Sequence, residues 1–395
     1  MQKAPYSLSV DGSNDTGLQK MNPLTVRIFD EDRKRVETRF LDMCTTSGKA
    51  AGTAQAIFDK MNAVLNLHNI PWVNCIVVGV DNTSVNIGRH NSIMTRVHGV
   101  NPSVYFMGCP CHIAHNVASA AADAFRNEVD FDVEELVVDI FYWFDKSTKR
   151  KGSLEEYCFC DVQYRKVIRY ISTRWLSLEK AVEHAIKVYA GLRSYFLSEC
   201  SSEQRFIRLQ TLFDTPVTEV YLLFYQSILP VFNHLNQFLQ REYPCIHLVH
   251  NCENLLKKLL VKFVKLSAIK TATTLAEVDT GIANQLSDDN IFVGFVTRQT
   301  PLKLERGDCS TLDSRKFLLG VRQFYVAAVE YIRSRLPLRD ELLIHARFVN
   351  FETRETCEFK DVEYFIERYN SVLGFTTSEL DQVFDEFVLP ASDEG

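Results

Sequence analysis

Two aspartates each follow a strand-like run, and together they could hold a divalent cation. Asp11 follows residues 6–10, which alternate apolar and polar side chains, and Asp81 follows the continuous apolar run 75–80. Carboxylate oxygens are the ligands that suit Mg²⁺ or Mn²⁺, and such ions activate a water or a 3′-hydroxyl at a phosphodiester. The alternative is that both aspartates are turn and helix-cap residues, because Asp11 precedes Gly-Ser and Asp81 precedes Asn-Thr-Ser.

A second group of chemically versatile residues lies in the run Cys109-Pro110-Cys111-His112-Ile113-Ala114-His115. Two cysteines and two histidines are sufficient ligands for Zn²⁺ where the backbone folds around the ion. Cys111 and His112 are adjacent, however, whereas structural zinc sites draw their ligands from two separated pairs. His112 and His115 are one helical turn apart on the same face. We therefore favour a structural cluster of Cys111, His112 and His115 over a zinc site.

The elements that must position these residues follow a recognisable order. Three strand-like runs with turn residues between them predict an antiparallel meander, and strands and helices then alternate up to about residue 125. The predicted strands are 6–10, 24–29, 36–43, 75–80 and 104–107, and the predicted helices are 50–67, 84–97 and 111–125. The order β-β-β-α-β-α-β-α predicts a ribonuclease-H-like mixed sheet, in which the first and fourth strands are central neighbours.

The second half of the chain has helical patterns and almost no strand signal. Helical periodicity or sustained runs of helix formers occupy 133–144, 177–196, 217–239, 248–266, 314–335 and 363–369, with prolines between or within them. We expect an α/β plus all-α protein: a ribonuclease-H-like catalytic-type core over 1–129, a helical insertion domain over 130–350 and an acidic C-terminal segment over 351–395.

The composition is that of a globular protein that does not coat nucleic acid indiscriminately. The 395 residues include 44 Lys and Arg against 50 Asp and Glu, a net charge of −6, and 46% are hydrophobic. We see no signal peptide and no apolar run long enough to cross a membrane. The 11 cysteines are therefore expected to be reduced thiols, in a nuclear or alternatively cytoplasmic protein without an organic cofactor.

The net charge hides an uneven distribution. Residues 146–193 carry 11 Lys and Arg against 5 Asp and Glu, whereas residues 352–395 carry 3 against 12. At helical spacing, Lys257, Lys258, Lys262 and Lys265 would follow a phosphate backbone with salt-sensitive affinity. The alternative is an ordinary solvated helix face.

Five sequence strings together resemble the hAT superfamily of DNA transposases, in particular its domesticated members in animals that are associated with zinc fingers. They are 7–15 (SLSVDGSND), 79–90 (GVDNTSVNIGRH), 111–116 (CHIAHN), 172–177 (STRWLS) and 239–247 (LQREYPCIH). The resemblance implies a ribonuclease-H-like core interrupted by a helical insertion, with an Asp-Asp-Glu triad and divalent metal. It assigns Asp11 and Asp81 to the first two acids. It also assigns Trp175 to stacking on a flipped base, with Arg174 beside it at the nucleic acid.

The sequence departs from the family pattern in ways that bear on activity. The Cys-x-x-His motif of the family is here His112-x-x-His115 with Cys111 displaced by one position, and we find no counterpart of the stretch that carries the catalytic glutamate. We also expect the BED-type finger and the dimerisation segment to be absent, so homo-oligomerisation is not predicted either way. The expectation is a transposase-like remnant that binds DNA, with a degenerate two-metal site and little or no transposition activity. The alternative is a protein-interaction scaffold built on the helical domain, with no DNA chemistry.

Overall fold

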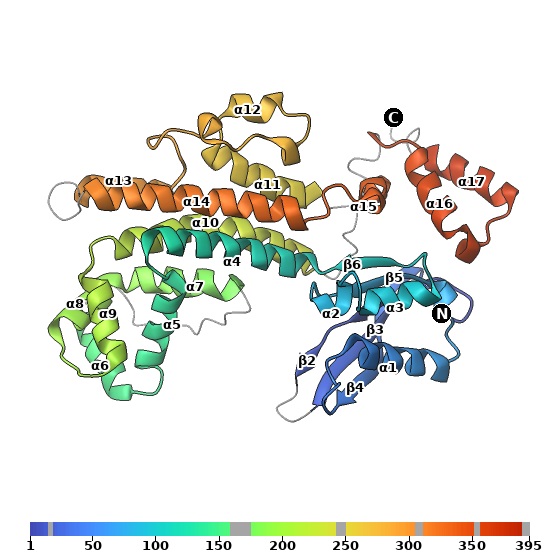
Figure 1. Ribbon diagram of the computed structural model, residues 1–395, viewed down its shortest axis with the longest axis horizontal. Coiled ribbons are helices and arrows are strands. Elements are labelled where there is room, and N and C mark those ends of the chain that lie inside the picture. Colours follow the sequence, from blue (N-terminus) through green and yellow to red (C-terminus); the bar gives the residue numbers. More distant parts are fainter. Residues whose placement is uncertain (15–18, 159–174, 242–249, 305–310, 351–355, 389–395) are drawn as a thin grey trace. The chain divides into compact units, whose positions relative to one another are not determined.

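The computed structural model describes residues 1–14, 19–158, 175–241, 250–304, 311–350 and 356–388 (Figure 1). The chain divides into two compact units. Met1–His112 and Arg339–Gly395 form the sheet unit, and Ile113–Cys245 with Val249–Leu338 forms the helical unit. The predicted segments 1–129, 130–350 and 351–395 are consecutive in sequence. The compact units are not, because the residues after Leu338 belong with the sheet.

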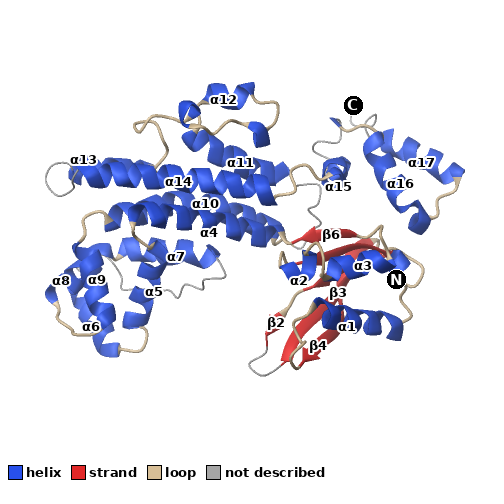
Figure 2. Cartoon of the chain, in the orientation of Figure 1, coloured by secondary structure: helices blue, strands red, loops and turns tan. Residues whose placement is uncertain are grey.

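One six-stranded mixed sheet organises the sheet unit (Figure 2). Its strands are β1 (Tyr6–Val10), β2 (Ser13–Asn14), β3 (Gln19–Asp30), β4 (Arg35–Ser47), β5 (Cys75–Val80) and β6 (Tyr105–Gly108). The long strand β3 pairs antiparallel with β4 along one edge and with β1 and β2 along the other. Strands β1, β5 and β6 are parallel, with β5 in the middle. The predicted combination of a mixed sheet with many helices is thus confirmed.

Helices α1 (Ala54–Leu67), α2 (Ser84–Ile87) and α3 (Ile93–Val100) connect the parallel strands. The Thr53 side chain caps α1 by accepting the Ala56 N–H, and Ser92 and Thr95 cap α3 reciprocally. The residues of α1 that recur every three or four positions are buried, and this face packs against β4 and α3. The core of the unit therefore fixes the positions of β1 and β5, and with them the edge of the sheet at which both strands end.

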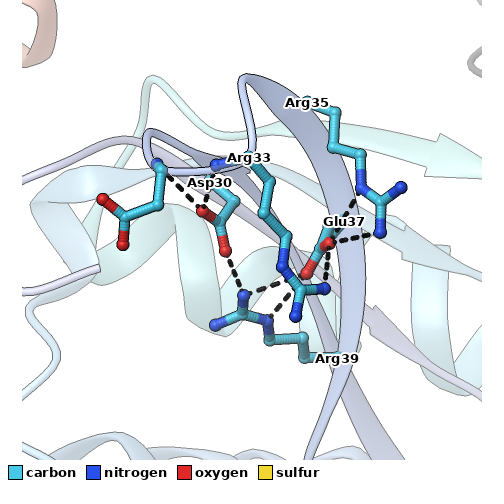
Figure 3. A network of polar contacts seen from close by, with 6 residues as sticks. Asp30, Arg33, Arg35, Glu37 and Arg39 are labelled. Atoms are coloured by element: carbon cyan, nitrogen blue, oxygen red, sulfur yellow. Dashed lines mark hydrogen bonds and ion pairs between the residues drawn. The ribbon is translucent and has the colours of Figure 1, made fainter.

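The turn between β3 and β4 is held by a network of acidic and arginine side chains (Figure 3). Asp30 Oδ1 accepts the backbone N–H of Arg33 at 3.0 Å, and Glu37 accepts hydrogen bonds from Arg33 at 2.8 Å and from Arg35 at 3.0 Å. Together with Arg39, these guanidinium groups lower the pKa of Glu37 to about 2, with the bond from Arg33 the largest cause. The three arginine side chains are exposed, so solvent screens these ion pairs and the network orders the hairpin tip more than it stabilises the fold.

The helical unit is built from α4 to α14. They are α4 (Pro110–Val129), α5 (Val133–Phe144), α6 (Thr148–Tyr157), α7 (Trp175–Lys187), α8 (Tyr189–Ser198), α9 (Gln204–Asp214), α10 (Thr218–Leu239), α11 (His250–Phe263), α12 (Leu266–Thr271), α13 (Phe295–Leu304) and α14 (Thr311–Arg335). A large aromatic cluster fills the space between α4, α10 and α14, with Phe125, Phe224 and Phe324 all fully buried. In the described residues, no helix is both long and apolar enough to cross a membrane.

The C-terminal residues return to the sheet unit as α15 (Glu341–His345), α16 (Lys360–Leu373) and α17 (Thr377–Val388). The Tyr105 hydroxyl donates to Asp340 at 3.0 Å, and the Tyr369 hydroxyl donates to the Ile76 carbonyl at 3.4 Å. Residues that are more than 230 positions apart in the sequence are therefore in contact beside β5 and β6.

Candidate functional site

Asp11 and Asp81 lie at the same edge of the sheet. Their preceding residues, Val10 and Val80, are register partners in the parallel pair of β1 and β5. Since parallel strands end at a common edge, the two carboxylates leave neighbouring central strands at equivalent positions. Asp11 is exposed and Asp81 is half-buried. The structure therefore brings the two aspartates together as the strand order of the sequence predicted.

Asp81 also organises the turn that follows β5. Its Oδ1 accepts the backbone N–H of Thr83 at 2.9 Å and the side-chain N–H of Asn86 at 2.7 Å. Burial alone would raise the pKa of Asp81, but these hydrogen bonds and the nearby His112 outweigh burial and lower it. The turn role and the ligand role are compatible, because a carboxylate accepts several hydrogen bonds or metal contacts at once.

We expect Asp81→Asn to weaken the fold near neutral pH by about 1 kcal/mol, because an ionised acceptor is replaced by a neutral one. The pKa of Asp81 is lowered in the folded state, so its contribution is fully present above the unfolded pKa of about 3.9. It is lost as the pH falls through the lower folded pKa. Thermal melts of the variant and the wild type should therefore differ most at pH 5–7 and converge in acid. A difference that grows as the pH falls would contradict this assignment.

Strand β6 ends at the same edge of the sheet, and the residue that follows it is Cys109. The Cys109 N–H donates to the Val80 carbonyl at 2.9 Å, and the Cys109 carbonyl accepts the Asn82 side-chain N–H at 2.8 Å. A side chain on Gly108 would meet the Asn82 amide oxygen, so the Asn82 side chain would have to move and give up its bond to Cys109. Helix α4 begins at the next residue, Pro110, which places Cys109 at the N-cap position.

The surroundings of the Cys109 sulfur favour its thiolate form. The sulfur accepts hydrogen bonds from the thiol of Cys111 and from both the ring and the backbone N–H of His112. The bond from Cys111 is the largest cause, and together these contacts lower the pKa of Cys109 to about 5 although burial opposes the shift. In return the Cys109 sulfur raises the pKa of His112, which burial alone would lower, and the charges of Asp81 and Asp11 contribute.

The structure adds one residue to the cluster favoured by the sequence. Cys111 and His112 lie together as expected, but their neighbour at the sheet edge is Cys109, whereas His115 lies further along α4 in the helical unit. Sequence reasoning named the string but did not single out Cys109. The available signal was a cysteine directly before Pro-Cys-His at a strand-to-helix turn, which is an N-cap position.

The donor set fits one hydrated Mg²⁺ or Mn²⁺ better than a pair of ions. Two carboxylates supply hard oxygen ligands, and Mg²⁺ commonly binds one or two carboxylates while keeping its waters. In the part of the chain that the structure describes, no three His, Cys, Asp or Glu side chains converge on one point as metal ligands do. The nearest additional groups are sulfur and imidazole, and His112 is favoured in its protonated, cationic form. These are poor partners for a second hard cation.

The residues predicted to contact nucleic acid are in varied surroundings. Trp175 begins α7, and Arg174 lies outside the described residues. Lys257 and Lys258 are exposed on α11, whereas the Lys265 ammonium donates to the Ala283 carbonyl at 2.7 Å. The Lys262 ammonium lies 3.4 Å from the centre of the Phe292 ring. Burial, with the nearby Lys258, lowers the pKa of Lys262 to about 8.

Comparison with known proteins adds no family to this description. No protein-family model matches the chain, and a search of curated proteins found no significant match.

Proposed function

We propose that this chain is a ribonuclease-H-like nucleic-acid-binding protein, derived from the hAT transposases, that carries a degenerate phosphodiester site. The observation that carries the proposal is the register of β1 and β5, which places Asp11 and Asp81 side by side at the ends of central parallel strands. In such a site a bound divalent cation supplies positive charge for phosphate oxygens. The two carboxylates would hold that cation, and the sheet would hold the carboxylates.

The topology and the chain path support this lineage. The strands run in the order β4-β3-β1-β5-β6, with an antiparallel meander followed by two parallel strands that helices connect. The helical unit interrupts the sheet unit in sequence, since residues 339–395 return to it. When a domain is inserted into a ribonuclease-H-like core, the chain leaves the core and later returns to it in the same way.

Loss of efficient catalysis follows from the number of carboxylates. Two-metal transesterification requires ions on both the attacking and the leaving oxygen, and a third acid usually completes their ligands. The described residues place only Asp11 and Asp81 together at this edge. We therefore propose phosphate binding through one cation, with little or no strand transfer.

Cation binding tests the site directly. Calorimetric titration of the full chain with MnCl₂ should give about one site, and the double variant Asp11→Asn/Asp81→Asn should lose at least tenfold in affinity, because both charged ligands are removed. Asp385→Asn, an exposed acid on α17, is the matched control and should bind as the wild type does. Equal binding by the double variant would refute the site. Efficient Mg²⁺-dependent nicking of plasmid DNA that Asp81→Asn abolishes would refute the degenerate character.

Salt dependence tests the contribution of the helical unit to nucleic-acid binding. If Lys257 and Lys258 each neutralise one phosphate, Lys257→Ala/Lys258→Ala should reduce the slope of log K against log salt by about 2 for duplex DNA. Fluorescence anisotropy with a labelled duplex at several salt concentrations measures this slope. An unchanged slope would remove these two lysines from the interface.

A second candidate function, a protein-interaction scaffold, is favoured by exposed apolar side chains on the helical unit. Ile282 is 89% exposed and Leu266 is 58% exposed. They lie on neighbouring segments, because the Lys265 N–H donates to the Asn284 carbonyl at 2.8 Å. Leu266→Ser/Ile282→Ser should abolish partner capture while leaving DNA affinity unchanged if the scaffold function is correct. Unchanged capture would remove this surface from consideration.

A further inference from the structure

We propose that Cys109 and Cys111 form a redox-active dithiol, which hydroperoxides oxidise to an intramolecular disulfide. The inference concerns the thiols at the start of α4 and does not depend on the proposed nucleic-acid function. It rests on two cysteines separated by a single proline, on the contact between their sulfur atoms and on the helix end at which they lie.

The backbone fixes the first cysteine at the N-cap of a long helix. Cys109 is tied to β5 by its N–H bond to the Val80 carbonyl and to the following turn by the bond from Asn82. Its sulfur accepts the backbone N–H of His112, the third residue of α4, as an N-cap side chain does. The helix dipole adds a positive field at this position.

The second cysteine is placed to react with the first. The side chain of Cys111 lies within hydrogen-bonding reach of the Cys109 sulfur, so the two thiols are direct neighbours. Both residues are half-buried, and His112 beside them is exposed, so small oxidants reach the pair from solvent. A thiolate with a second cysteine beside it is the combination of an attacking and a resolving cysteine.

Other cysteines of the chain are in the opposite environment. Burial raises the pKa of Cys75 to about 12 and of Cys44 to about 11, and it also raises that of Cys158. These thiols are protonated near neutral pH, whereas contacts with Cys111 and His112 keep Cys109 ionised. Oxidation is therefore expected first at Cys109 among these four.

The oxidation balances in two steps. The Cys109 thiolate attacks one oxygen of the hydroperoxide, an S–O bond forms, the O–O bond breaks, and the alkoxide takes a proton to leave as an alcohol. The Cys111 sulfur then attacks the resulting sulfenic acid, an S–S bond forms, and the S–O bond breaks. The hydroxide leaves with the Cys111 thiol proton as water. The dithiol loses two electrons and the hydroperoxide gains them.

The pH dependence of thiol reactivity distinguishes this site from an ordinary thiol. With a pKa of about 5, Cys109 is almost fully ionised at pH 6, whereas a model thiol with a pKa of about 8.5 is about 0.3% ionised. Its lower intrinsic nucleophilicity offsets part of this, so toward an aromatic disulfide it should react about tenfold faster than the model thiol at pH 6 and about thirtyfold more slowly at pH 9. The Cys111→Ser variant, which keeps a hydrogen-bond donor, is used for this profile so that only one sulfur reacts.

Peroxide treatment of the full chain tests the disulfide itself. Hydrogen peroxide should give a peptide that contains Cys109 and Cys111 with the loss of two hydrogens, which dithiothreitol restores. Cys111→Ser should stop at a sulfenic acid on Cys109 that dimedone traps, and Cys109→Ser should give neither product. Serine is a good N-cap, so Cys109→Ser is expected to fold, and an unchanged circular dichroism melt verifies this.

A cysteine elsewhere in the chain provides the matched control. Cys200→Ser removes an exposed thiol of the helical unit and should leave both products unchanged. The proposal fails if Cys109 is no more reactive at pH 6 than the model thiol, or if the disulfide does not form in the wild type. It also fails if stoichiometric zinc stays bound after dialysis and is lost in Cys109→Ser, because the sulfurs would then be metal ligands.

Discussion

Phe224→Ala should lower the free energy of unfolding of the helical unit by about 3–5 kcal/mol. The Phe224 ring is fully buried, and its centre lies 5.4 Å from that of Phe125 on α4 and 5.4 Å from that of Phe324 on α14. Truncation removes contacts to both helices at once and leaves a cavity that three helices cannot close without losing their mutual packing. Urea unfolding monitored by circular dichroism measures the loss.

Hydrogen exchange then shows where the loss occurs, since a chain of two units need not unfold in one step. The amides of α4, α10 and α14 should lose protection together, while those of β1 and β5 should keep theirs. Phe295→Ala is the matched control, because Phe295 is in the same unit but 77% exposed, and it should change stability by about 0.5 kcal/mol or less. A similar loss in both variants would show that the aromatic cluster is not the core.

Asp361→Ala should release α16 from the segment that carries His345 and Arg347, at a cost of about 2–4 kcal/mol. Asp361 is fully buried, and its Oδ1 accepts the ring N–H of His345 at 2.8 Å while Oδ2 accepts the Arg347 side-chain N–H at 3.4 Å. Removing the carboxylate leaves these two side chains and the Glu358 backbone N–H without their acceptor. Since α16 carries the Tyr369 contact with Ile76, loosening its start should weaken that contact too.

Hydrogen exchange and limited proteolysis of residues 356–388 measure this release. Protection in α16 should fall while protection in α4 and α14 is unchanged. Asp385→Ala removes an exposed acid from α17 and is expected to have no effect beyond about 0.5 kcal/mol. If α16 stays protected in Asp361→Ala, its attachment depends on other contacts.

Periodicity predicted the positions of the main elements well and their ends less well. The predicted strands 6–10 and 75–80 coincide with β1 and β5. Both were identified from the order of apolar and polar residues within the strand itself, which requires no knowledge of distant contacts. The predicted strands 24–29 and 36–43 are shorter than β3 and β4, which continue into mostly polar residues that pair with each other at the end away from the hairpin turn, such as Gln19 with Ser47. Backbone pairing there is supported by the partner strand, which a single sequence does not reveal.

In the helical half, too, sequence patterns located the helices better than their ends. The predicted helix 217–239 contains Pro230, and α10 continues through this proline, because its neighbours on both sides are buried in the aromatic core. The predicted helix 177–196 is instead two helices, α7 and α8, that meet at Val188. Tertiary packing outweighed local propensity in the first case, and the chain turned without a proline or glycine in the second.

By itself the sequence determined which residues end the central strands, since alternation and apolar runs depend only on near neighbours. It therefore located Asp11 and Asp81 and predicted that they lie together. Only the tertiary structure decided that Cys109 joins Cys111 and His112, because the pairing of β6 with β5 sets where α4 begins. The tertiary structure also decided that residues 339–395 belong with the sheet. Contacts such as that of Tyr105 with Asp340 join residues far apart in the sequence, and local sequence patterns do not reveal such contacts.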